Sequence, residues 1–190
     1  QGVSSAASDV YKRQVEHNDE SGSIDEQAYM KKLSSDVRVV SIVHTSPVTG
    51  MTVDLEKITK EVRNVTPDCI IIVDGIQHSS HGAIDVQKYD IDGYVVSPYK
   101  MFSRHGYGVA WASNRLCTLN KEQLADGPFE NWELGTRDAG SYATFSDVVD
   151  YLDWLGSNFT ESENIRERLE ASSLATVSYT HLTLPTILLV

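Results

Sequence analysis

Two residues of opposite charge, Asp74 and Lys100, each follow a short apolar run in the sequence. The run before Asp74 is CIIIV (69–73), and the run before Lys100 is VVSPY (95–99). A lysine that is held away from water can act as an amine nucleophile at neutral pH. A carboxylate in such surroundings keeps its charge only when a cation lies beside it. Taken alone, each residue is more often an ordinary side chain at the end of a strand. If both lie in one crevice, Lys100 could react as an amine while Asp74 holds a negative charge nearby.

The apolar runs and the helical periodicities predict an α/β fold that would position these residues. Apolar residues at helical spacing are typical of amphipathic helices, and β-branched runs are typical of buried strands. We expect strands at 37–43, 69–73, 92–97 and 106–113, and helices at 24–33 (capped by Asp25), 53–65, 141–155 and from 164–171 onward. Because the strands are apolar throughout, we expect a three-layer fold with a mixed, mostly parallel sheet that is covered on both faces.

Polar segments follow three of the predicted strands, at 44–46, 74–81 and 97–100. In sheets of this kind the chemistry lies at the carboxyl ends of the strands, so we expect these segments to meet. A lysine that forms a Schiff base and an acid that faces a pyridine nitrogen are the two groups that a pyridoxal 5'-phosphate (PLP) site requires. The pair Asp74 and Lys100 therefore predicts such a site.

A series of short motifs resembles one known family. The chain carries HTSPVTG (44–50), DGIQ (74–77), DVQ (85–87), SPYK (97–100), GYG (106–108) and WELGT (132–136), in that order. This order is similar to that of the class V aminotransferase and cysteine desulfurase family of PLP-dependent, fold type I enzymes. The resemblance covers about residues 15–170 and implies part of the large domain of a PLP-dependent transferase.

The resemblance implies roles for individual residues around the cofactor. Lys100 would form the Schiff base and later move the substrate α-proton. Asp74 would pair with the pyridine nitrogen, and Gln77 would hydrogen-bond the phenolic oxygen. Ser97 and Tyr99 would contact the phosphate.

The resemblance also implies an assembly and a substrate class. Family active sites lie at a dimer interface, so Thr136 would reach the phosphate bound by the partner subunit of a homodimer. The substrate would be a small-molecule amino acid. We expect cysteine desulfurase-like chemistry, the cleavage of a C–S bond, with amino transfer or epimerisation as the alternatives within the family.

Some features depart from the family pattern or lie outside this chain. Pro47 stands where the family often has Asn, and proline has no donor for the cofactor. Tyr99 stands where desulfurases usually have His, although a tyrosine hydroxyl can still donate to phosphate. A phosphate-binding turn, a ring-stacking residue, a carboxylate-binding Arg and a late nucleophilic Cys have no counterpart here. Cys117 is interpreted as structural, and His78 is expected to line the substrate side of the pocket.

The two ends of the chain differ in character from the rest. The segments QGVSSAASDVYKRQ and VSYTHLTLPTILLV lack continuity with their neighbours and resemble translated adapter sequence. We therefore predict non-native ends at 1–14 and 177–190, a partial PLP-binding large domain at 15–155, and the start of a small C-terminal domain at 156–176. The alternative to an active enzyme is that an internal fragment of this kind is catalytically inactive.

The composition argues against several kinds of partner. The net charge is −11, with 41% hydrophobic and 23% charged residues. Nucleic acids and anionic membranes require clustered Lys and Arg, so neither is expected as a partner. The two cysteines lie 48 positions apart and suggest reduced thiols. The sequence has no apolar run of about 18 residues and no charged-then-apolar opening segment, so we expect neither a membrane span nor a secretion signal. We therefore expect a cytoplasmic protein.

Histidines permit one rival interpretation, a metal hydrolase. His78 and His81, together with Asp74, His44 and His105, could suggest metal ligands. Their spacing does not fit an HExxH motif, and loop histidines are common without metal, so no metal is expected. Glycine-rich nucleotide-binding motifs do not occur in the sequence.

Overall fold

The computed structural model describes residues 12–18, 20–24, 26–125, 127, 132, 134–136 and 138–187. For residue 26 and residues 177–187 it describes the backbone only. Within these residues every helix is too short or too polar to cross a lipid bilayer.

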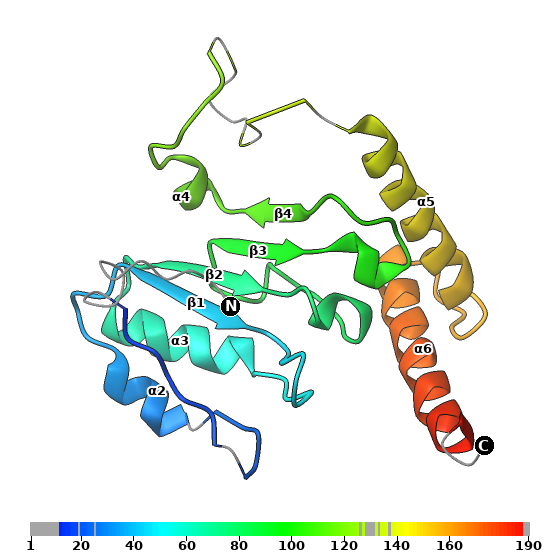
Figure 1. Cartoon of the computed structure of the whole chain (residues 1–190), viewed down its shortest axis with the longest axis horizontal. Helices are drawn as coiled ribbons and strands as arrows, with labels where there is room; N and C mark the ends of the chain where they lie inside the picture. The colour runs from blue at the N-terminus through cyan, green and yellow to red at the C-terminus, as the bar shows by residue number, and fades with distance from the viewer. Residues whose placement is uncertain are drawn as a thin grey trace.

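Four strands form a single sheet in the order β1-β2-β3-β4 (Figure 1). They are β1 (Val39–Val43), β2 (Ile70–Asp74), β3 (Gly93–Val96) and β4 (Val109–Ala112). The first three are parallel, and β4 runs antiparallel to β3. The expectation of a mixed, mostly parallel α/β sheet is confirmed, and the carboxyl ends of β1, β2 and β3 lie at one edge.

The helices connect and flank this sheet. They are α2 (Glu26–Lys32), α3 (Leu55–Val65), α4 (Asn114–Cys117), α5 (Ala139–Gly156) and α6 (Ile165–Ile187), with the 3-10 turns η1 (His78–Ser80) and η2 (Pro98–Met101). All four predicted helices are confirmed, whereas α4, η1 and η2 were not predicted because three or four residues carry no periodicity. The expected cap Asp25 lies outside the described residues.

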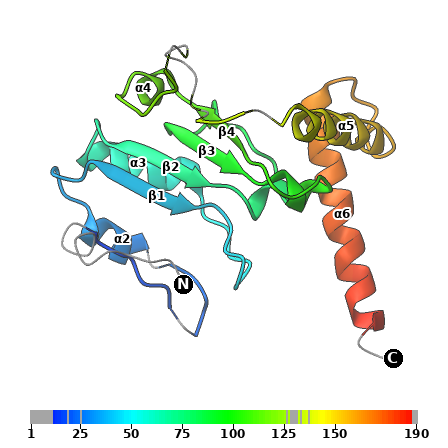
Figure 2. The same ribbon diagram turned by 45° about the horizontal axis from the view of Figure 1, so that its top comes forward.

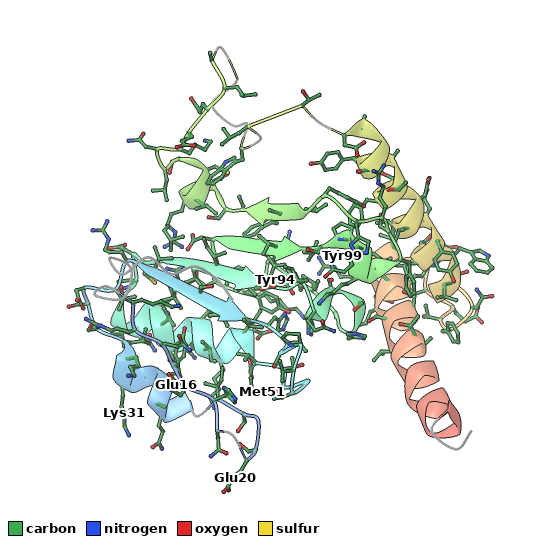
Figure 3. The ribbon with its side chains drawn as sticks, viewed as in Figure 1. Glu16, Glu20, Lys31, Met51, Tyr94 and Tyr99 are labelled. Atoms are coloured by element: carbon green, nitrogen blue, oxygen red, sulfur yellow. The ribbon has the colours of Figure 1, made fainter. Side chains whose placement is uncertain are left out.

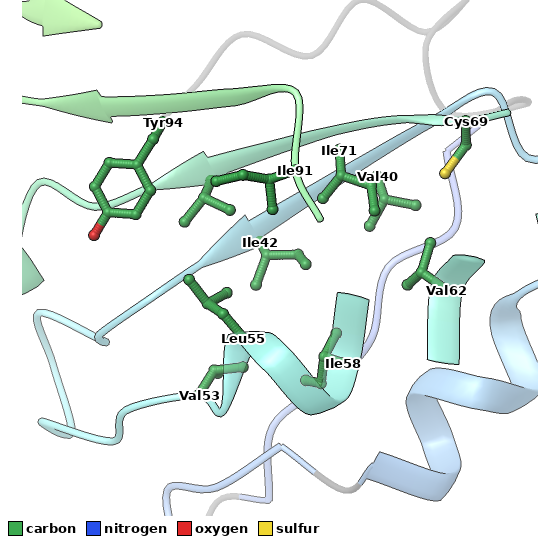
Figure 4. Close-up of a cluster of buried hydrophobic side chains, with 11 residues drawn as sticks. Val40, Ile42, Val53, Leu55, Ile58, Val62, Cys69, Ile71, Ile91 and Tyr94 are labelled. Carbon is green, nitrogen blue, oxygen red and sulfur yellow. The ribbon is translucent and has the colours of Figure 1, made fainter. Parts of the chain in front are cut away.

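Helix α3 covers one face of the sheet. The Asp54 side chain accepts a hydrogen bond from the backbone N–H of Lys57 and caps the helix, at 3.0 Å. Leu55, Ile58 and Val62 recur at helical spacing, so they share one face and are buried. Figure 4 shows this face against the strands, where it packs with the buried residues Val40, Ile42, Val53, Cys69, Ile71, Val73, Ile91 and Tyr94.

The other face of the sheet is open over β1. Side chains alternate along a strand, so Val39, Ser41 and Val43 point away from α3. Val39 is 60% and Val43 is 44% exposed. The expectation that both faces are covered is therefore wrong for the described part of the chain, where α3 lies on one side of β1 and β2 (Figure 2). The apolar character of β1 showed that it could be buried, but not which segment would cover it.

A buried ion pair between Arg63 and Asp92 lies at the amino-terminal edge of the sheet. Asp92 is fully buried and accepts hydrogen bonds from Arg63 Nη2 (2.8 Å), the Ile71 backbone N–H (2.9 Å) and Ser113 Oγ (3.0 Å). Arg115 Nε lies 2.8 Å from its second oxygen. Burial alone would raise the pKa of Asp92, but these hydrogen bonds and charges outweigh it and hold the pKa below its usual value.

We expect Asp92→Ala to lower the free energy of unfolding by roughly 3–5 kcal/mol, because Arg63 would keep a buried charge without its partner. The neighbouring Asp90 is 62% exposed and also contacts Arg63, at 3.3 Å. Asp90→Ala is the matched control and should cost less than about 1 kcal/mol. Urea unfolding measures both, and equal losses in the two variants would contradict the assigned role of Asp92.

Candidate active site at the carboxyl edge of the sheet

The three polar segments of the sequence lie side by side where β1, β2 and β3 end. Two backbone hydrogen bonds extend the strand pairing into the turns. The His44 N–H donates to the Asp74 carbonyl, and the Gly75 N–H donates to the Val95 carbonyl, each at 2.9 Å. The prediction that these segments meet at one edge is confirmed.

Lys100 and Gln77 are in direct contact across this edge. Lys100 Nζ donates to Gln77 Oε1 at 2.6 Å. Lys100 lies in η2, directly after β3, and Gln77 is the residue that precedes η1 after β2. Two residues 23 positions apart are thus joined by the ends of neighbouring strands.

Asp74 is the last residue of β2 and is half-buried. It alternates with the buried Val73, so its side chain lies on the sheet face opposite α3. It pairs in register with Val43 on one side and Val95 on the other. One carboxylate oxygen accepts a hydrogen bond from the Ile76 N–H at 3.0 Å, which fixes the turn toward Gln77.

Ser97 and Tyr99 flank the lysine in the same turn. Ser97 precedes η2, and its carbonyl accepts the Lys100 backbone N–H at 3.0 Å, while its hydroxyl does not cap the turn. The Tyr99 ring is 40% exposed and stacks on His105, with ring centroids 4.4 Å apart. Lys100 Nζ lies 5.9 Å from the Tyr99 ring centroid. Figure 3 labels Tyr99 of this turn and Tyr94 of β3.

Thr136 is the one predicted site residue that lies in a separate place. It is exposed, in the described run 134–136 that leads to α5. Glu133 of the same predicted motif lies outside the described residues.

The turn that carries Lys100 is anchored to α5. Phe102, which ends η2, has a left-handed backbone with φ 67°. Its ring meets Tyr151 of α5 edge-on, with centroids 6.4 Å apart. Ser103 Oγ lies 3.3 Å from Thr144 Oγ1 of the same helix. Helix α5 therefore restrains the residues just after Lys100.

A buried cluster of polar rings lies beneath the Asp74–Gln77 turn, and the sequence did not reveal it. His44 and His78 stack with ring centroids 3.5 Å apart. His44 Nδ1 is 2.8 Å from the Tyr94 hydroxyl, and His78 Nδ1 is 2.8 Å from Thr45 Oγ1. His78 Nε2 is 3.2 Å from the Ala83 carbonyl. The one available signal was that polar residues follow adjacent strands.

His78 does not line an open pocket as expected. The residue is 9% exposed, and both of its ring nitrogens are engaged by protein atoms. The expectation was wrong because η1 turns this side chain inward against His44 rather than toward the sheet edge.

Burial keeps the two histidines neutral. It lowers the pKa of His44 to about 4, and the adjacent His78 adds to the shift. Burial also lowers the pKa of His78. The pKa of Tyr94 is raised by burial and by the nearby Tyr89 and Asp74. At neutral pH the cluster is therefore uncharged.

The histidines that could have suggested a metal site do not converge on one point. The rings of His44 and His78 lie face to face. Among the described residues, no group of three or more His, Cys, Asp or Glu side chains could hold a metal ion.

Comparison with known proteins identifies the family. The sequence model of the family described as Aminotransferase class-V matches residues 6–175. The chain belongs to this family, whose members are PLP-dependent enzymes.

Individual relatives agree with this assignment. The chain is 36% identical over 84 residues to a cysteine desulfurase of Wigglesworthia glossinidia brevipalpis, covering 44% of this chain and 20% of the relative. It is 27% identical over 146 residues to a probable cysteine desulfurase of Ureaplasma parvum, covering 68% and 36%. The solved apo structure of a cysteine desulfurase from Thermococcus onnurineus matches with a TM-score of 0.62 at 22% identity, covering 78% and 40%.

The structural match shows that the fold is that of the fold type I PLP-dependent enzymes. The chain spans 20% and 36% of the two curated relatives and 40% of the solved structure.

We expect acid to destabilise the protein between pH 6.5 and about 4, through His44. The unfolded chain binds a proton at His44 below pH 6.5, whereas the folded chain resists it down to about pH 4. Stability that is present at pH 7 is therefore lost as the pH falls through this window, by on the order of 3 kcal/mol.

Urea unfolding between pH 7.5 and 4.5 measures this loss. His44→Asn should flatten the pH dependence more than His105→Asn, the same substitution at an exposed position. Identical slopes for wild type and His44→Asn would refute the expectation.

Proposed function

We propose that this chain is the cofactor-binding part of a PLP-dependent enzyme that cleaves the C–S bond of an amino acid, in the manner of a cysteine desulfurase. In this proposal Lys100 is the residue that binds PLP covalently. The observation that carries it is the 2.6 Å contact between Lys100 Nζ and Gln77 Oε1, at the sheet edge where Asp74 also lies.

The residues at this edge fit PLP in their chemistry. The cofactor has an aldehyde, a phenolic oxygen, a basic ring nitrogen and a phosphate. The edge offers a primary amine at Lys100, an amide at Gln77 and a carboxylate at Asp74, which suit the first three groups. The hydroxyls of Ser97 and Tyr99 lie on either side of the lysine turn and are suitable phosphate donors.

When bound, PLP supplies an electron sink for the pair of electrons released at the substrate α-carbon. The residues of this chain would provide the rest. Asp74 would hold a proton on the ring nitrogen by its negative charge, and Gln77 would orient the ring from its phenolic side. Lys100 Nζ would accept the α-proton of the substrate and return it.

The positions of the two cysteines bear on the reaction. Cys69 precedes β2 and Cys117 ends α4, so both lie at the opposite edge of the sheet from Lys100. A thiol that accepts sulfur would therefore come from another segment or another molecule. This observation keeps amino transfer or epimerisation as the second candidate, although relatives named cysteine desulfurase support C–S cleavage.

We also infer a cytoplasmic homodimer for the complete enzyme. Thr136 is exposed and free to meet a phosphate bound by a second subunit. The two free cysteines fit a reducing compartment. The 190-residue chain by itself could be inactive if the remaining parts of the site come from elsewhere.

Incubation with PLP followed by borohydride reduction and peptide mass spectrometry tests the site. We expect a pyridoxyl group on Lys100, no adduct there in Lys100→Ala, and unchanged labelling in Lys31→Ala, where the lysine is exposed. Equal labelling of Lys31, Lys60 and Lys121 in the wild type would argue against Lys100 as the cofactor lysine.

Asp74→Asn tests the carboxylate. We expect it to slow exchange of the substrate α-hydrogen with deuterated solvent by roughly 10- to 100-fold, because a charge-assisted hydrogen bond is lost. The measurement uses a chain that also contains the parts of the relatives that this sequence does not span. Asp85→Asn serves as the control. Unchanged exchange in Asp74→Asn would remove Asp74 from the proposed mechanism.

A further inference from the structure

The buried ring cluster beneath the Asp74–Gln77 turn has an arrangement of protons that its contacts determine. We infer that Thr45 and His78 are positioning residues that hold Gln77 against Lys100 through this arrangement. The contacts belong to the protein itself, and their relevance to PLP rests on the proposed function.

The proton positions follow from which atoms can donate. The Ala83 carbonyl can only accept, so His78 Nε2 must carry the hydrogen. In a neutral ring Nδ1 is then an acceptor, and it takes the hydroxyl hydrogen of Thr45 at 2.8 Å. The Thr45 oxygen in turn accepts from Thr52 Oγ1 at 2.9 Å. A single chain of donors therefore runs from Thr52 to Ala83 through the His78 ring.

Packing also restrains the ring of His78. A Cβ at Gly82 would lie 2.4 Å from this ring, so the turn after η1 wraps closely around it. On the other side the ring stacks on His44, which is held by the Tyr94 hydroxyl at 2.8 Å. A Cβ at Gly75 would in turn lie 2.1 Å from the Tyr94 ring. The backbone at Gly75 and at Gly82 thus lies directly against the cluster.

Gln77 is covalently next to His78, so the orientation of one limits the other. Without the Thr45 hydroxyl, the buried Nδ1 of His78 would lose its donor in a ring that packing confines. The 77–82 turn would then shift with the ring, and Gln77 Oε1 would leave Lys100 Nζ. His44 meets Tyr89 and Tyr94, and His81 acts on His78. Burial lowers the pKa of both rings and so preserves the arrangement.

Reductive methylation with formaldehyde and borohydride tests this without any cofactor. A lysine ammonium held by a hydrogen bond is protected, so release of Gln77 should expose Lys100 to the reagent. Thr45→Val removes the hydroxyl and keeps the shape. We expect it to raise the initial methylation rate of Lys100, relative to exposed Lys31, by roughly tenfold. Thr45→Ser keeps the hydroxyl and should stay close to wild type.

A double-mutant comparison separates positioning from general loosening. Gln77→Met should accelerate methylation of Lys100 as Thr45→Val does, and the double variant should be no faster than Gln77→Met. Additive effects, or no effect of Thr45→Val where Gln77→Met has one, would overturn the inference.

Nitrogen NMR of the histidine rings provides a second readout on the cofactor-free protein. We expect the Nε2–H tautomer for His78 in all three proteins, because the Ala83 carbonyl is unchanged. In Thr45→Val the Nδ1 resonance should shift through loss of its hydrogen bond, whereas in Thr45→Ser it should match wild type. A predominant Nδ1–H tautomer in wild type would overturn the inference. If PLP fails to label Lys100 while the methylation and NMR results hold, the proposed function fails and the positioning role stands.

Discussion

The parallel pairing of β1, β2 and β3 is the constraint on which the rest of the site depends. Parallel strands end at the same edge, so segments 44–46, 74–81 and 97–100 become neighbours although they are far apart in the chain. The contact between Lys100 and Gln77 exists only because this register is kept. A slip of one residue in β2 would turn the Asp74 side chain from the open face to the face packed on α3.

The strands and the longer helices could be predicted because their periodicity is a property of the local sequence. The meeting of segments 74–81 and 97–100, where Lys100 contacts Gln77, could be predicted once the strands were taken as parallel. The stack of His44 on His78 could not, since it depends on how two turns pack 34 positions apart. The open face of β1 was also missed, because an apolar strand such as Val39–Val43 shows a capacity for burial and not the presence of a covering segment.

The family and the fold are shown by the comparisons, whereas the turns around Pro47 and Tyr99 are features of this chain's own structure. The match over residues 6–175 shows the family, and the solved relatives show the fold. Locally, Pro47 lies in a turn closed by the Thr45–Thr52 bridge, and Tyr99 stacks on His105. Tyr99 is therefore part of a two-ring unit beside the lysine.

Phe102, at the end of the turn that holds Lys100, affects how many backbone conformations that turn can adopt. A left-handed backbone costs a residue with a side chain about 1–2 kcal/mol, and Phe102 adopts it while its ring meets Tyr151 edge-on. Glycine would adopt the same backbone freely, but it would also give the unfolded chain more states and the folded turn more freedom. A residue that is locally unfavourable thus restricts the backbone conformations open to the turn that holds Lys100, and its ring connects that turn to α5.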